Sequence, residues 1–362
     1  MFRHLSLCAT IAFMPTERVS SFDSINDVEQ LEDLISAPTP LVVESMRRLK
    51  GDVLILGVGG KMGPSLARMI ERASQEANVQ RRVIGVSRFS SGGIERQLRQ
   101  WGISTLAADL LDREELKRLP DVENVIYMAG MKFGSSGNEP TTWAMNSYLP
   151  GMVCERFAHS RIAAFSTGNV YGLVPAGGGG SVETDLPNPV GEYAMSCLGR
   201  ERIFQYFCEA MKIPVALLRL NYAVEMRYGV LLDIAKKVAA GQVVDVSMGY
   251  VNVIWQGDAN AMAILSLEQV STPAKVLNLA GPEVLRIRDV AEEFGRLMGK
   301  SVKFSGSEAA DALLGNGEEA YRLFGRPRVS ARQVMAWVAD WVKRGGETLE
   351  KPTHFEARDG RF

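Results

Sequence analysis

The stretch GEYAMSCLGRER, residues 191 to 202, holds the side chains that bear most directly on chemistry. Tyr193 carries a phenol that can give or take a proton, but the pKa of a free tyrosine is about 10, so a tyrosine that acts as a base near neutral pH needs a neighbour that stabilises its phenolate. A cation one helical turn away would do this, and Cys197 occupies that position. A thiol is neutral, and a thiolate would raise the tyrosine pKa. The source of the stabilising charge is therefore open.

Metal and triad chemistry have little support in the sequence. The three histidines, His4, His159 and His354, are scattered and never have the spacing of metal ligands, which disfavours both a histidine metal site and a Ser/His/Asp triad. The four cysteines show no CxxC spacing, so neither a disulfide framework nor a zinc site is predicted. We expect no metal and a reducing, cytoplasmic location.

The segment GVGGKMG joins an apolar run, DVLILG, to a stretch with helical spacing of apolar residues. Three of its glycines follow the spacing GxxGxxG. Glycine allows a tight turn and a close approach of the backbone to a pyrophosphate, whose charge then lies at the N-terminus of the helix. Because a strand precedes the segment and a helix follows it, we predict a dinucleotide-binding loop made of Gly57, Gly59, Gly60, Lys61, Met62 and Gly63.

The end of the second predicted strand, VSRFSS, bears on which dinucleotide binds. An NAD site places an Asp or Glu there to hold the ribose hydroxyls, and this sequence has Ser87 instead. Arg88, with Ser90 and Ser91, offers donors matched to a 2′-phosphate, so NADP is predicted in preference to NAD. A solvated loop charge is the alternative interpretation of Arg88. Asp109, at the end of the third predicted strand, could reach the adenine or belong to the cap of the next helix.

Apolar runs and helical patterns alternate along the chain from residue 51. We predict a long helix through 143–158, another that begins at Tyr193, and strands at 52–57, 83–87, 104–109, 124–130, 162–167 and 215–221. Strands that are apolar throughout favour a parallel sheet covered on both faces. The predicted fold class is α/β, a Rossmann-type doubly wound parallel sheet with a smaller α/β substrate domain on its C-terminal side.

The overall composition excludes some classes of protein. The chain has 362 residues, with 41 basic against 42 acidic ones, no basic run and no apolar segment of eighteen residues, so nothing favours nucleic acid or a membrane. The start, MFRHLSLCATIAFM, could pass for a weak signal peptide but lacks an A-x-A cleavage site. We interpret residues 1–13 as a frayed extension or as the product of an upstream start codon, with a helix following around Asp27 to Ile35.

Several motifs occur together in the order and spacing of a known family. They are GVGGKMG, AADLLD, VIYMAGMK, Asn146, FSTGNVYG, VETDLPNPVGEY and RLNYAVE. On these motifs the chain resembles the extended short-chain dehydrogenase/reductases, the NAD(P)-dependent epimerase/dehydratase family, over residues 52 to 345. Later, VNVIWQGDANAMAILSLE resembles the strand and helix around a family Asp, here Asp258, and KVLNLAGPEVLRIRDVAEEFGRLMG resembles the next strand and helix.

The resemblance implies an organisation and a reaction. It divides the chain into an N-terminal extension (1–50), a Rossmann domain (51–222), a substrate-binding part interleaved with it (223–345) and a tail (346–362). The reaction is hydride transfer between a nicotinamide and a hydroxyl or ketone, with Tyr193 as acid/base and Thr167 as its hydrogen-bonding partner. Besides the loop and strand-end residues above, the resemblance assigns Leu110, Ala129, Gly130, Lys132 and Tyr193 to the cofactor, and Thr167, Asn169 and Asn221 to the substrate.

The family has a lysine where this chain has Cys197, and three explanations stay open. The charge of the oxidised nicotinamide could lower the tyrosine pKa by itself, Lys132 could supply the cation, or catalysis is lost and only a nucleotide site survives. Lys132 lies in AGMKFG, which resembles the AGLK stretch of UDP-galactose 4-epimerase, where the lysine faces the active site. Arg200, about two helical turns beyond Tyr193, is interpreted as structural. We favour an active enzyme that includes Lys132 in its catalytic set; the alternative is a non-catalytic NAD(P)-binding regulatory or partner protein.

The substrate side also departs from the family. Members that act on nucleotide sugars usually carry an arginine just before the strand that matches VNVIW and another in an RPGD-like segment, where this chain has SMGY and GNGEEAYRLFGRPR. Arg326 and Arg328 remain candidates to line the cleft, but no diphosphate clamp is evident. We therefore expect a small carbohydrate-like substrate, such as a free sugar, a sugar acid or a polyol.

Three further features are left with alternatives or rest on the resemblance. The glycine run 177–180 suits a mobile flap over the substrate or a surface loop. Trp255 and Gln256 could face the cleft or the core. By resemblance to the family, the helices at 143–158 and 193–211 are expected to pair across a homodimer.

Overall fold

A seven-stranded parallel sheet forms the centre of the computed structural model, which describes residues 24–90, 92–132, 134 and 136–360. All pairs of neighbouring strands in this sheet are parallel. In spatial order the strands are β12 (Lys275–Leu279), β7 (Val215–Leu220), β5 (Arg161–Thr167), β4 (Asn124–Tyr127), β1 (Val53–Leu56), β2 (Val83–Ser87) and β3 (Ser104–Ala107). The order reverses direction at β1, as in a Rossmann fold, so the predicted fold class is confirmed.

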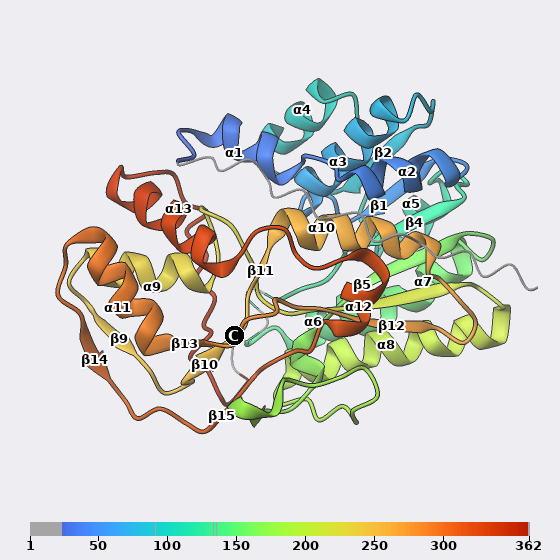
Figure 1. Cartoon of the computed structure of the whole chain (residues 1–362). Coiled ribbons are helices and arrows are strands. Elements are labelled where there is room, and N and C mark those ends of the chain that lie inside the picture. The colour runs from blue at the N-terminus through green and yellow to red at the C-terminus, as the bar shows by residue number, and fades with distance from the viewer. Residues whose placement is uncertain (1–23, 91, 133, 135, 361–362) are drawn as a thin grey trace, which may run out of the picture.

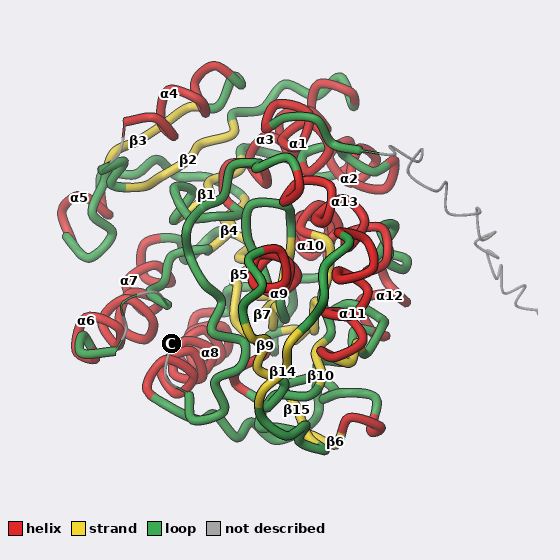
Figure 2. The backbone as a smooth tube through the Cα atoms, turned by 90° about the vertical axis from the view of Figure 1, so that its left-hand side faces the viewer, coloured by secondary structure: helices red, strands yellow, loops and turns green. Residues whose placement is uncertain are grey.

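Helices cover both faces of this sheet (Figures 1 and 2). On one face lie α2 (Pro40–Arg48), α3 (Gly63–Glu76) and α10 (Gln256–Leu265). On the other lie α5 (Arg113–Lys117), α7 (Leu149–Arg156) and α8 (Glu192–Met211). Beside the outer strands lie α4 (Gly92–Gln100), which packs on β3, and α12 (Glu318–Phe324), which packs on β12.

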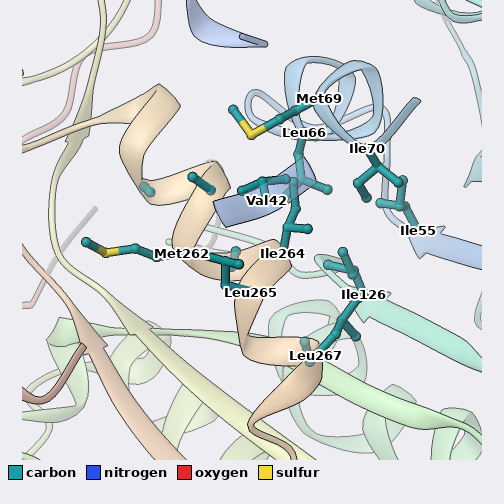
Figure 3. Packing of buried hydrophobic residues seen from close by; sticks show 14 of the residues in the cluster. Val42, Ile55, Leu66, Met69, Ile70, Ile126, Met262, Ile264, Leu265 and Leu267 are labelled. Carbon is teal, nitrogen blue, oxygen red and sulfur yellow. The ribbon is translucent and has the colours of Figure 1, made fainter. Parts of the chain in front are cut away.

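The core on the first face is continuous from helix to sheet. Figure 3 shows Val42 of α2, Leu66 of α3 and Ile264 of α10 converging over Ile55 and Ile126 of the sheet. All five side chains are fully buried, and burying each contributes about 1.5–3 kcal/mol relative to an exposed position. This packing holds the first strand and the glycine loop that follows it in a fixed position.

The remaining chain builds a smaller α/β part beside the sheet (Figure 1). Its helices are α9 (Val230–Ala239), α11 (Ile287–Met298) and α13 (Ala331–Lys343), and they enclose a second core together with α1 (Val28–Ile35). Its strands form short two-stranded pairs. These are β8 (Ala223–Val224) with β11 (Ile254–Trp255), β9 (Val243–Asp245) with β14 (Lys303–Ser305), β10 (Tyr250–Val251) with β13 (Leu285–Arg286), and β6 (Val174–Pro175) with β15 (Asp311–Ala312).

Some predicted bounds were wrong. The segment VNVIW is two strands, because β10 pairs with β13 and β11 with β8, and the buried Asn252 between them turns its side chain to Gly281 and Gly315. The long helix 143–158 is α6 (Glu139–Trp143), a π-helical turn (Ala144–Tyr148) and α7. Helix α2 was not predicted, although Thr39 caps it and Pro40 opens it.

Trp255 and Gln256, which could have faced either the cleft or the core, both lie in the core. The Trp255 ring is 2 % exposed and packs edge-on against Trp337 with 5.6 Å between ring centroids. The amide of Gln256 is buried and donates to Ser65 Oγ at 3.0 Å. Both residues therefore connect the small α/β part to the sheet and do not face the cleft.

The two ends of the described chain pack onto the folded body. Asp27 caps the expected helix α1, which is confirmed, whereas the interpretations of residues 1–13 concern residues outside the described ones. Near the other end, Thr353 donates from its N–H and its hydroxyl to Asp233, and Phe355 is buried. How the chain divides into units that fold independently stays a prediction.

No helix in the described ranges combines the length and the apolar character needed to cross a bilayer.

Asp258 ties the small α/β part together, and we expect Asp258→Ala to lower the free energy of unfolding by about 3–5 kcal/mol. The carboxylate accepts from the backbone N–H groups of Arg328 and Val329 at 2.9 and 3.1 Å and from the Arg328 guanidinium at 3.0 Å. Its side chain is 3 % exposed, so the substitution leaves buried donors without this acceptor. Urea unfolding followed by circular dichroism measures the loss.

The matched control is Glu318→Ala, which removes the partner of Arg326 from a pair whose side chains are 60 % and 61 % exposed. An exposed pair is screened by water, so this loss should stay below about 1 kcal/mol. Equal losses for the two variants would contradict the assignment of Asp258 as a buried anchor.

Candidate active site

The carboxyl ends of four parallel strands form one wall of a cavity between the sheet and the small α/β part. Gly57 follows β1, Gly130 follows β4, Thr167 ends β5 and Asn221 follows β7, and all four line this cavity. Parallel strands place their carboxyl ends at a single edge, where open α/β sheets bind ligands. The fold therefore brings together residues that are far apart in the sequence.

Most of the predicted catalytic, loop and substrate residues line this cavity. They are Gly57, Gly60, Lys61, Met62, Gly63, Gly130, Lys132, Thr167, Asn169, Tyr193 and Asn221. The other predicted cofactor residues do not line it: Gly59, Ser87, Arg88, Ser90, Asp109, Leu110 and Ala129. Ser91 lies outside the described residues. The assignment of roles to all these residues stays a prediction.

The glycine loop has the geometry that a pyrophosphate needs. Gly57 has φ +88°, and a Cβ there would lie 2.7 Å from the backbone N of Ala129. A Cβ at Gly63 would clash with the carbonyl oxygen of Val58. Helix α3 begins at Gly63 without a side-chain cap at Met62, so side chains leave its first N–H groups uncapped for an anion. These residues fit the diphosphate of a dinucleotide.

The second strand ends close to this loop. Ser87 Oγ would lie 2.5 Å from a Cβ at Gly59, so the serine packs against the loop where an acid was expected in an NAD site. Arg88 follows it and is exposed. Asp109 lies beyond the end of β3, and its carboxylate accepts from the N–H of Leu111 at 3.0 Å. Asp112, and not Asp109, caps the next helix.

Tyr193 lies in the first turn of α8, facing the cavity. Its hydroxyl is hydrogen-bonded to both Thr167 and Cys197. Burial raises the pKa of Tyr193 well above 10, the proximity of Cys197 raises it further, and the charge of Arg200 and the hydrogen bond with Thr167 lower it. In the protein alone the phenol is therefore protonated at neutral pH, which suits it as a proton donor.

Two lysines line the cavity. Lys132 Nζ lies 5.9 Å from the centroid of the Tyr193 ring, and burial lowers the pKa of this lysine to about 8. Lys61 Nζ donates to the carbonyl oxygen of Ala223 at 2.8 Å and lies 4.0 Å from the centroid of the Tyr228 ring. Burial lowers the pKa of Lys61 to about 7.

Arg200, which the sequence analysis interprets as structural, also borders this cavity. Its side chain is buried in the cavity wall, where it donates to Asn146 Oδ1 at 2.6 Å and to the carbonyl oxygen of Phe165 at 2.9 Å. Its spacing of seven residues from Tyr193 could have indicated it, because residues seven apart share a helix face. Tyr222, Tyr228 and Thr353 were also missed, and no local signal identifies them.

Other candidates have structural partners away from the cavity. Neither Arg326 nor Arg328 lines it, since they pair with Glu318 and Asp258. The glycine run 177–180 does not border the cavity, because it packs against the segment at Gly315 and Asn316. In the described part of the chain, no group of His, Cys, Asp or Glu could hold a metal ion.

The cavity has an uneven balance of charge. Three basic side chains line it, Lys61, Lys132 and Arg200, and no Asp or Glu occurs among the described lining residues. Clefts lined by one sign of charge concentrate ligands of the opposite sign. The site is therefore suited to anions.

Comparison with known proteins agrees with this geometry. The family model described as "NAD dependent epimerase/dehydratase family" matches residues 53–246, more than half of the chain. The chain belongs to this family. The expected family is thus confirmed, and with it an enzyme of the nicotinamide-dependent epimerase/dehydratase class. No curated protein matches the sequence.

Solved structures of low sequence identity share the fold. UDP-glucuronic acid 4-epimerase from Bacillus cereus, in complex with NAD, is 18 % identical with a TM-score of 0.68, over 81 % of this chain and 99 % of that one. The UDP-glucose 4-epimerase of Thermus thermophilus, in complex with NAD, is 18 % identical with a TM-score of 0.65, over 80 % and 98 %. That of Thermotoga maritima, with UDP-glucose, is 17 % identical with a TM-score of 0.65, over 81 % and 99 %.

Dinucleotide binding should take up protons. An anion beside Lys61 and Lys132 restores their pKa values from about 7 and about 8 toward the ordinary 10.5. Between about pH 7 and pH 10 the free protein then holds fewer protons than the complex, so affinity should fall as pH rises through this range. Calorimetric titration of NADPH at about pH 8, in buffers of different ionisation enthalpy, measures the uptake.

Lys61→Met should remove part of this proton uptake, whereas Lys117→Met, on the exposed side of α5, should leave it unchanged. An uptake of zero in the native protein, or equal uptake in the native protein and Lys61→Met, would count against a role for Lys61 in anion binding.

Proposed function

We propose that this protein is an NADP-preferring oxidoreductase of the epimerase/dehydratase type that acts on a hydroxyl or ketone of a small sugar acid. One observation carries the proposal: Tyr193, which is hydrogen-bonded to Thr167, lines the same cavity as the glycine loop and three basic side chains. The dinucleotide, when bound, supplies or accepts the hydride. The chain's own residues must then orient the sugar and move one proton.

The proton belongs to Tyr193 in this proposal. When a substrate hydroxyl is oxidised, its carbon loses a hydride and its oxygen loses a proton, which the phenolate of Tyr193 accepts; in reduction the phenol returns it. Thr167 holds the reacting oxygen from the end of β5, and its hydroxyl is itself oriented by Asn169 Oδ1 at 2.9 Å. Lys132, 5.9 Å from the centroid of the Tyr193 ring, adds positive charge beside the phenol.

The charge of the cavity supports an acidic substrate. The diphosphate of the cofactor neutralises charge near the glycine loop, while Lys132 and Arg200 add positive charge to a cavity whose described lining residues include no Asp or Glu. A carboxylate on the substrate matches this excess. The neighbouring structures bind nucleotide sugars such as UDP-glucose, but here Arg326 and Arg328 are engaged elsewhere, so we infer a substrate without a nucleotide.

The remaining parts of the proposal concern cofactor, assembly and location. Exposed Arg88 after β2, with Ser87 in place of an acid, favours NADP over NAD. Exposed Trp143, Tyr148 and Tyr206 on the α6–α8 surface favour a homodimer. Cys154, Cys197 and Cys208 are free thiols, which suits a reducing cytoplasm.

Tyr193→Phe should lower turnover at least about a hundredfold, because it removes the group that transfers the proton. Cofactor affinity should change little, since only the phenolic oxygen is lost. Absorbance of the reduced nicotinamide, followed with a panel of sugar acids, neutral sugars and UDP-sugars, measures turnover and substrate class together.

The matched control is Tyr206→Phe on the exposed side of the same helix, which should retain full turnover. Full turnover in Tyr193→Phe would refute the assignment of the acid/base. Activity confined to UDP-sugars would refute the substrate class.

Arg88→Ala should weaken binding of NADPH but not of NADH, because a 2′-phosphate is the only group that distinguishes the two ligands. Calorimetric titration of both dinucleotides measures the difference. Arg96→Ala, an exposed arginine on α4, serves as the control for a general change of charge. Equal affinities for the two dinucleotides in the native protein would reject the preference.

Light scattering at micromolar concentration should give twice the chain mass of 39.7 kDa. Tyr206→Asp should produce monomers, because it places a charge in the proposed apolar interface of α8. Leu186→Asp, at a more exposed apolar residue before that helix, should leave the dimer intact. A monomer mass for the native protein would contradict the proposal.

A further inference from the structure

Three side chains lie on the face of α8 that is directed toward the cavity and the core beside it. Tyr193, Cys197 and Arg200 follow one another at spacings of four and three residues, which align them on a helix. Helical side chains lean toward the N-terminus, so the long Arg200 side chain reaches back past Cys197 toward Tyr193. Both Arg200 and Tyr193 line the cavity, and Tyr193 is hydrogen-bonded to Cys197.

The Arg200 guanidinium has no acidic partner in the described ranges. It is 6 % exposed and donates only to neutral oxygens, namely Asn146 Oδ1 at 2.6 Å, the Phe165 carbonyl at 2.9 Å and the Asn146 carbonyl at 3.4 Å. The contrast is Arg219 on β7, which is equally buried and forms a bidentate pair with Glu201. A guanidinium cannot shed its proton at accessible pH, so its charge is permanent.

A buried charge of this kind is costly unless an opposite charge meets it. The ionisable groups around Arg200 are Cys197, Tyr193, Tyr127 and Glu201. Glu201 is already paired with Arg219, and Tyr127 is fully buried away from the cavity. Of the two that remain, only Tyr193 lines the cavity, so a negative charge that forms and disappears during a reaction there belongs on its oxygen.

The packing around the guanidinium is specific. A Cβ on Gly130 would clash with Nη2 of Arg200, so the charge lies directly against the backbone at the carboxyl end of β4. Asn146 completes the arrangement: its Oδ1 accepts from Arg200 and from the N–H of Met131, and its Nδ2 donates to Ser196 Oγ at 2.9 Å. Arg200 is thereby fixed in position beside the site.

We propose that Arg200 supplies, from one turn further along α8, the positive charge that Cys197 cannot, and that it stabilises the phenolate of Tyr193 during proton transfer. Arg200 does not itself transfer the proton but acts through Tyr193, so this proposal rests on the proposed function of Tyr193. The charge of Arg200 lowers the pKa of both Tyr193 and Cys197. The other charged group facing the ring is Lys132, whose pKa of about 8 means that its charge is lost in alkaline solution, whereas that of Arg200 persists.

A titration of Tyr193 tests this in the full chain without cofactor or substrate. Tyrosinate absorbance is recorded against pH, and the curve of the same variant carrying Tyr193→Phe is subtracted, so that only Tyr193 is observed. Because burial holds its pKa well above 10, the series is built on Cys197→Lys, which brings the pKa down. Adding Arg200→Met should raise it again by about one unit or more.

Two controls separate charge from structure. Adding Arg202→Met, which removes an exposed arginine from the same helix, should leave the Tyr193 pKa unchanged. Adding Arg200→Lys instead keeps the positive charge but not the planar guanidinium, so the Tyr193 pKa should rise much less than with Arg200→Met. Should Arg200→Met fail to fold by circular dichroism, Gly130→Ala displaces the guanidinium without removing it, and should also raise the pKa.

One result would overturn the proposal: a Tyr193 pKa that stays unchanged when Arg200→Met or Gly130→Ala is added to the folded chain. Since no substrate is needed, a wrong substrate class would leave the titration unaffected and would show only in the turnover assays.

Discussion

The parallel arrangement of the central sheet is the constraint on which the site depends. Every strand runs in the same direction, so the turns after β1, β4, β5 and β7 meet at one edge. The glycine loop, Gly130, Thr167 and Asn221 are brought together for this reason, and not by contacts of their own. Helix α8 must start at the same edge, and Gly191, with φ +84°, turns the chain into it and so places Tyr193 against Thr167.

The second organising principle is the distribution of buried charge. Outside the cavity three arginines with little exposed surface pair with acids: Arg219 with Glu201, Arg227 with Glu225 and Glu32, and Arg328 with Asp258. No Asp or Glu occurs among the described residues that line the cavity, and there Arg200 donates to neutral oxygens. A low dielectric strengthens both arrangements, because a charge there acts strongly on its neighbours. Paired charges therefore stabilise the core around the site, whereas the site itself has an excess of positive charge.

The chain ends contribute more to this arrangement than their position in the sequence suggests. Helix α1 adds Leu31 and Ile35 to the core of the small α/β part, and its Glu32 binds Arg227. Near the other end, Thr353 lines the cavity while it donates to Asp233. The substrate side is therefore shaped by segments that lie outside the matched family region, residues 53–246.

Features that depend on local chemistry could be predicted from the sequence. Apolar runs of four to seven residues predicted the parallel strands, the glycine spacing predicted the loop, and Tyr193 with Thr167 followed from the family motifs. These could be predicted because a strand, a tight turn or a helix start is specified by neighbouring residues. Asn146, noted as a motif residue, and Arg200, interpreted as structural, gave no sign in the sequence that their side chains contact each other.

Which charged side chains contact each other depends on the packing of distant elements. Asp258 and Arg328 are seventy residues apart and form an anchor, Arg200 lies in the cavity wall instead of pairing with an acid, and the strand expected at VNVIW divides between two partners. The physical reason is that the partner of a buried charge or of a strand edge is set by packing between distant elements. Sequence spacing shows which face a side chain occupies, but what lies opposite that face is fixed only when the sheet and its covering helices have closed around it.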